Sequence, residues 1–242
     1  MNTPRPTPRL FCFRCVRVPV TLCSLKTVRH FTWVGATALV VISSALWLWA
    51  ASVTRRWIFA ENGAMENFQV GCLCLGAAVL AWQARSVKQA HQRVFFTALA
   101  LFFVTFALRE FDVRKGDWPP LVTRVLDGVI RNLWLGSLWL VIGYFAYRHR
   151  AGLLSFGLKW LGSRAGRVLL VAGLFWVLAA AVDKADAFGT RRRNLLAEEL
   201  IEVNAALLMA FSAVISMIPS RNMLPGHTAS QWSAAEAHDH PT

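Results

Sequence analysis

The chain has 242 residues, of which 56% are hydrophobic and 16% are charged, whereas about a quarter of the residues of a typical soluble domain are charged. Its mean hydropathy of +0.44 excludes a disordered chain, and five cysteines in 242 residues exclude a disulfide scaffold. The formal net charge of +13 is typical of a nucleic-acid-binding protein when the chain is soluble. Membrane proteins, however, also concentrate Lys and Arg in their cytoplasmic segments.

Six apolar segments are close to the length that crosses a membrane, about 20 residues of helix for about 30 Å of hydrocarbon. They are residues 31–54, 66–84, 94–112, 129–147, 168–186 and 195–218. We therefore predict an all-α membrane protein, a six-transmembrane-helix bundle with short loops. In this prediction residues 1–30 form a basic N-terminal arm, 31–219 the transmembrane domain and 220–242 a disordered tail.

The basic residues predict the side of the membrane on which each connection lies. With both termini in the cytoplasm, the cytoplasmic segments hold 15 of the 26 basic residues and two of the 13 acids. The outer segments then hold 11 of each, so the whole net charge of +13 lies inside. This asymmetry follows the positive-inside rule and explains the charge without nucleic acid. The asymmetry favours a location in the bacterial inner membrane, with an organelle membrane as the alternative. In either membrane we expect lipid to be the partner.

Two connections have the pattern of surface helices. Residues 152–166 combine apolar side chains with Lys159 and Arg164, which is typical of a short helix at the cytoplasmic interface. Residues 121–129 follow Pro119 and Pro120 and carry one apolar helical stripe. This second segment is either a lid-like outer helix or the entry to the fourth span.

Several spans are too short at their outer ends. The uncharged runs 94–108, 168–182 and 205–218 stop about five or six residues short of a full crossing. Acids complete the missing length, and a lone carboxylate in the hydrocarbon costs at least about 2.5 to 3.5 kcal/mol. We therefore expect these acids to face one another, a basic partner, an ion or water in one outward-opening polar pocket. The alternative is a thin bundle whose helix ends project from the membrane.

The pocket residues divide into three predicted roles. Helical spacing places Glu198, Glu199 and Glu202 on one face of the last span. We assign Glu199, Glu202 and Glu110 as catalytic acid–base groups, and Glu66, Asp112, Asp183, Asp186 and Glu198 as hypothetical ligands of Mg²⁺, Ca²⁺ or Mn²⁺, which prefer oxygen. Arg109, Arg131, Arg191 and Arg192 are the predicted anion-binding residues. No histidine lies in any predicted span, which argues against zinc or haem. The alternative is that the acids pair with the arginines, as the equal counts outside allow.

Three classes of function fit this pattern. The first is a divalent-cation-dependent enzyme that acts at the outer leaflet on a lipid or another phosphate-bearing substrate. The second is a non-catalytic assembly, sensor or lipid-organising factor, which needs only paired charges. The third is an ion- or proton-coupled transporter. A transporter also needs a path through the inner half of the membrane, and the inner halves of the six predicted spans contain no ionisable residue.

Overall fold

The computed structural model describes residues 25–53, 63–110, 119–126, 128–185 and 191–218 of the chain. These residues form eight helices and no strand. The helices are α1 (Leu25–Val53), α2 (Ala64–Ser86), α3 (Ala90–Glu110), α4 (Pro120–Leu126), α5 (Gly128–Arg148), α6 (Arg150–Leu161), α7 (Arg164–Ala185) and α8 (Arg191–Ser216). Six of them, α1, α2, α3, α5, α7 and α8, are long and apolar enough to cross a membrane. The predicted six-helix bundle is therefore confirmed.

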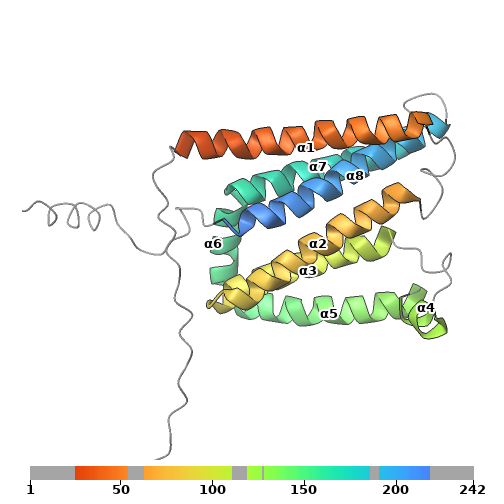
Figure 1. The fold of residues 1–242 in the computed structure, drawn as a ribbon. Helices are drawn as coiled ribbons and strands as arrows, with labels where there is room; N and C mark the ends of the chain where they lie inside the picture. The colour runs from red at the N-terminus through yellow and green to blue at the C-terminus, as the bar shows by residue number, and fades with distance from the viewer. Residues whose placement is uncertain (1–24, 54–62, 111–118, 127, 186–190, 219–242) are drawn as a thin grey trace, which may run out of the picture.

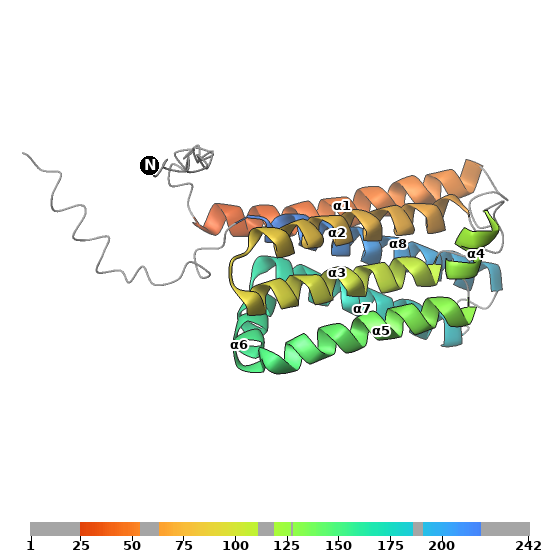
Figure 2. The same ribbon diagram turned by 90° about the horizontal axis from the view of Figure 1, so that it is seen from below.

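Helix α8 lies at the centre of the bundle and packs against α7, α2 and α1, while α2 packs against α3, and α3 against α5 (Figures 1 and 2). In the most apolar part of each helix, 61% of the residues of α8 are buried, compared with 11% in α1 and 6% in α5. Helices α1 and α5 are thus peripheral. Because α8 carries the three glutamates of the predicted pocket, the central position of this helix brings their side chains against its neighbours.

The beginning of α1 and the end of α8 lie at the same end of the bundle, as six crossings require (Figure 1). We call this end, where α6 also lies, the α6 end, and the opposite end, where α3 ends and α8 begins, the cluster end. Helix α1 begins at Leu25, within the residues that we assigned to the N-terminal arm. Residues 1–24 and 219–242, which include the rest of the arm and the whole predicted tail, lie outside the described residues.

The two predicted surface helices are both present. Helix α6 packs against α3 and α7, and Trp160, 2% exposed, joins it to the core of the bundle. Helix α6 ends at Leu161, earlier than predicted, because α7 begins at Arg164 and passes close to it at Gly166. Helix α4 is separate from α5, because Gly128, the first residue of α5, has a φ of 53°, which glycine adopts without strain. Of the two interpretations of residues 121–129, a distinct short helix is correct.

Candidate functional site

Helix α8 places three glutamates near the cluster end. Glu202 is 8% exposed, and Glu198 and Glu199, one turn earlier, are partly buried. Asp183 of α7 and Glu110 of α3 lie close enough to Glu198 to repel its charge, and Glu66 of α2 and Glu110 act in the same way on Glu199. Acids from four helices thus lie around α8 at this end, whereas the helical spacing alone predicts only that Glu198, Glu199 and Glu202 share one face.

Arg109, in the last turn of α3, is the basic partner of two of these acids. Its Nε donates to Glu110 Oε1 at 2.7 Å, and one of its terminal nitrogens, Nη2, donates to Glu202 Oε1 at 3.2 Å. The arginine side chain is 58% exposed, whereas those of Glu110 and Glu202 are 12% and 11% exposed. The guanidinium thus lies over two largely buried carboxylates and neutralises part of their charge.

Two aromatic rings also contact the Arg109 guanidinium. Its Cζ lies 5.6 Å from the ring centroid of Phe106 on α3 and 4.9 Å from that of Trp176 on α7, which are cation–π distances. Trp176 Nε1 in turn donates to the sulfur of Met209 on α8 at 3.3 Å. Neither ring was predicted from the sequence as part of the site. The i,i+3 spacing of Phe106 and Arg109 is visible in the sequence, but no local pattern indicates Trp176.

A buried amide stands beside Glu199. Gln69 of α2 is fully buried, and its Nε2 donates to Glu199 Oε2 over a long 3.4 Å. Its Oε1 has no hydrogen-bond partner among the described residues. A buried acceptor without a donor costs about 1 to 3 kcal/mol, so such an atom indicates a missing partner. We define the polar cluster as Gln69, Arg109, Glu110, Glu198, Glu199 and Glu202.

The remaining predicted residues are only partly described. Arg131 of α5 donates from Nη1 to the backbone oxygen of Leu108 at 2.8 Å, which ties α5 to the end of α3. The structure thus gives Arg131 a backbone partner. Asp112, Asp186 and the side chains of Arg191 and Arg192 lie outside the described residues.

The predicted metal ligands do not form a ready-made cage in the described part of the chain. There, no three His, Cys, Asp or Glu side chains lie close enough together to hold a metal ion. This covers Glu66, Asp183 and Glu198, whereas Asp112 and Asp186 are not described. Any divalent cation bound by the described residues therefore takes fewer than three of these side chains and completes its coordination with other oxygen atoms.

Two cavities lie at the α6 end, far from the polar cluster. One, of about 320 Å³, is bounded by α2, α3, α6 and α8 around Gln83. The other, of about 460 Å³, lies between α2 and α3 beside Arg85, Arg93 and Thr97. The sequence predicts a pocket only at the cluster end. The amide of Gln83, which follows a run of apolar residues and cysteines near the end of the second span, is the feature that would have indicated the first cavity.

Comparison of the chain with protein-family models, with curated proteins and with solved structures finds no match.

Proposed function

We propose that the polar cluster faces the outside of a bacterial inner membrane and binds a divalent cation. The orientation follows from the charges, because the cytoplasmic side then holds 15 basic residues and two acids. In this orientation the α6 end, where the described chain begins and ends, is the cytoplasmic end.

The observation that carries the cation is the pair of Gln69 and Glu199. Arg109 pairs with Glu110 and Glu202, but the described partner of Glu199 is the neutral Gln69 amide, whose Oε1 has no partner. A cation beside them takes the unused amide oxygen and the glutamate as ligands, and it offsets the charges of Glu198 and Glu110. Mg²⁺ suits such a site, because it keeps several waters and binds through one or two carboxylates together with substrate phosphates.

The function that fits best is that of a divalent-cation-dependent enzyme whose substrate is a phosphate-bearing lipid of the outer leaflet. The cation and the arginines of this end hold the phosphate, since guanidinium binds phosphate oxygens in pairs. Glu199 binds the cation, and Glu202 and Glu110 then serve as acid–base groups. Arg191 and Arg192, at the start of α8, are the arginines that the sequence places nearest to this face.

A second candidate is a non-catalytic assembly, sensor or lipid-organising factor. The contacts of Arg109 favour it, because two carboxylates and two rings already surround the guanidinium and join α3, α7 and α8. In this role the charges only hold the helix ends together, and neither a cation nor a substrate is required.

Thermal unfolding of the detergent-purified protein distinguishes the two. The protein is measured in EDTA and then with Mg²⁺, Ca²⁺ or Mn²⁺, because a ligand at about 100 times its dissociation constant adds about 2.7 kcal/mol of stability. We expect a rise that Glu199→Gln abolishes and that the tail variant Asp239→Asn retains. If a metal raises the stability, the next step is to assay the protein for activity on vesicles of phosphatidylglycerol. No rise with any metal would overturn the cation site and leave the non-catalytic candidate.

A further inference from the structure

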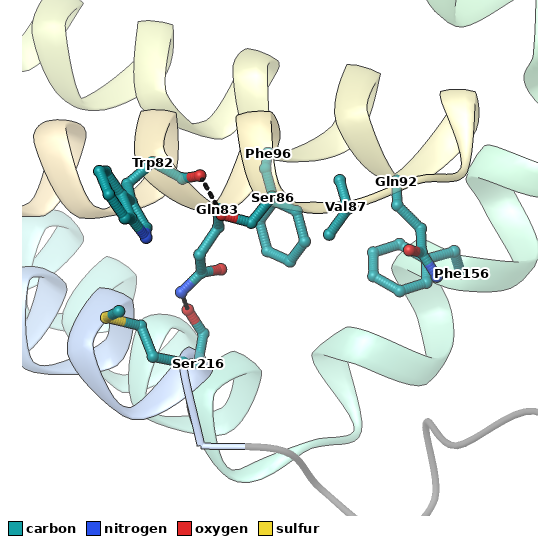
Figure 3. A pocket seen from close by; sticks show the side chains of 9 residues that line it. Trp82, Gln83, Ser86, Val87, Gln92, Phe96, Phe156 and Ser216 are labelled. Carbon is teal, nitrogen blue, oxygen red and sulfur yellow. Dashed lines mark hydrogen bonds between the residues drawn. The ribbon is translucent and has the colours of Figure 1, made fainter. Parts of the chain in front are cut away.

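A pocket of about 320 Å³ opens at the α6 end, on the other side of the bundle from the polar cluster. Aromatic rings form much of its wall, Trp82 from α2, Phe96 from α3 and Phe156 from α6 (Figure 3). Trp82 is 64% exposed on the flank of the bundle, so the pocket borders the lipid. Its volume lies in the range of small-molecule sites, about 300 to 1,000 Å³.

The Gln83 amide is fixed in one orientation at the wall of this pocket. Its Nε2 donates to Ser216 Oγ at 2.6 Å and to the Ala213 backbone oxygen at 3.2 Å, both on α8. Turning the amide over would place its oxygen against the Ala213 carbonyl oxygen, so the hydrogen-bond network assigns the orientation. Oε1 then points toward the space beside Phe96 and Phe156 (Figure 3).

This oxygen lacks a donor. Gln83 is 7% exposed, and its Oε1 has no partner among the described residues. The neighbouring Ser86 hydroxyl already donates its hydrogen to the Trp82 backbone oxygen at 2.9 Å, so it does not donate to Gln83 Oε1. A buried acceptor of this kind gains a full hydrogen bond when a donor reaches it.

The chemistry of the lining restricts the ligand. None of the residues that line the pocket is charged; the polar side-chain groups are the amides of Gln83 and Gln92, the hydroxyls of Ser86 and Ser216 and the indole N–H of Trp82. A charged head group would therefore be buried without a counter-ion, at a cost of several kcal/mol. The ligand that matches the pocket is uncharged, has an apolar body for the aromatic wall and carries a hydrogen-bond donor for Gln83.

We propose that this pocket binds an uncharged, hydroxyl-bearing amphiphile from the membrane, whose hydroxyl donates to Gln83 Oε1. The pocket lies where α2 and α8 end and α3 begins, at the level of the lipid head groups, where a hydroxyl of an amphiphile also lies. Because Oε1 lies just below the pocket surface, lining side chains turn outward slightly as the hydroxyl enters. This site is independent of the proposed function at the cluster end.

The test compares a photoreactive dodecanol that carries a diazirine with its methyl ether, which cannot donate. Both are titrated onto the full-length protein in detergent, and labelled peptides are quantified. We expect the alcohol to reach half-maximal labelling of the pocket peptides at a concentration about tenfold lower than the methyl ether does. This difference corresponds to about 1.4 kcal/mol of binding free energy. Equal labelling by the two probes, as when water alone fills the pocket, would overturn the proposal, and so would labelling confined to other parts of the chain.

Two variants keep the test decisive. Gln83→Met removes the acceptor, so the advantage of the alcohol should disappear, whereas Gln89→Met, at an exposed position outside the pocket, should retain it. Gln83→Met also loses the bonds to α8 and can fail to fold. Ser86→Phe leaves those bonds intact, since Ser86 is exposed at the end of α2, and fills the pocket. It should suppress labelling of the pocket by both probes, and unchanged labelling would contradict the site.

Discussion

One terminal nitrogen of Arg109, Nη2, lies 3.2 Å from Oε1 of Glu202, and this ion pair joins the last turn of α3 to the central helix α8. The glutamate side chain is 11% exposed and that of the arginine 58%. The pair therefore has one end in the bundle and one in solvent or head groups. It explains how α8 carries a carboxylate into an apolar bundle, because the arginine supplies the opposite charge at the boundary.

We predict that Arg109→Gln lowers the free energy of unfolding by about 1 to 3 kcal/mol, less than the loss of a fully buried partner, because water reaches the exposed side. The stability of Arg109→Lys should lie between those of the unchanged protein and Arg109→Gln, because the ammonium group keeps the charge but does not reproduce the forked guanidinium that contacts both glutamates. Thermal unfolding in detergent measures both. A double-mutant cycle with Glu202→Gln should give a coupling of about 1 kcal/mol.

The matched control is Arg85→Gln. Arg85 is exposed near the end of α2, at the opposite end of the bundle, so its loss should change stability by less than about 0.5 kcal/mol. Equal stability of Arg109→Gln and Arg85→Gln would show that the ion pair does not contribute to the fold.

The helices were predictable from the sequence, but their ends and contacts were only partly so. A run of about 20 apolar residues requires a helix in a membrane, whatever its neighbours are. A count of apolar residues stops at the first polar or charged side chains, whereas backbone hydrogen bonding can continue past them, and α1 accordingly begins at Leu25 instead of residue 31.

The candidate site was predictable as a set of charges and not as a set of contacts. Helical spacing alone places Glu198, Glu199 and Glu202 together. The contact of Arg109 with Trp176 depends on how α3 and α7 are rotated about their axes. Helices that are apolar on most faces do not define that rotation, so the ring contact and the pocket at Gln83 required the structure.

A second interhelical contact predicts that a double variant is more stable than one of its single variants. Asn204 of α8 donates from Nδ2 to Ser44 Oγ of α1 at 3.0 Å, and its Oδ1 has no partner among the described residues. Ser44→Ala should cost about 0.6 kcal/mol, the average for such bonds in membranes. Ser44→Ala with Asn204→Leu should recover most of the loss, because no polar group is left unpaired. Thermal unfolding of both variants measures this, and a double variant less stable than Ser44→Ala would contradict the prediction.

The orientation predicts which cysteines react from outside the cell. In a cysteine-free background, Asp117→Cys should react with a membrane-impermeant maleimide on intact cells, because residue 117 follows in sequence the end of α3, which lies at the cluster end. Gln89→Cys, between α2 and α3 at the α6 end, should react only after lysis. The reverse labelling pattern would show that the bundle has the opposite orientation, with the polar cluster on the cytoplasmic side.

Two glycines of α7 should respond in opposite ways to the same substitution. A Cβ at Gly166 would overlap the backbone oxygen of Trp160 and the Cα of Leu161, which are main-chain atoms that cannot move aside. Gly166→Ala should therefore cost about 3 kcal/mol, at the upper end for overpacking, by pushing α6 from α7. A Cβ at Gly173 meets nothing within 4 Å, so Gly173→Ala should be neutral or stabilising by up to about 1 kcal/mol through helix propensity. Thermal unfolding of the two variants measures the difference, and similar stabilities would mean that α6 does not pack against the first turn of α7 as described.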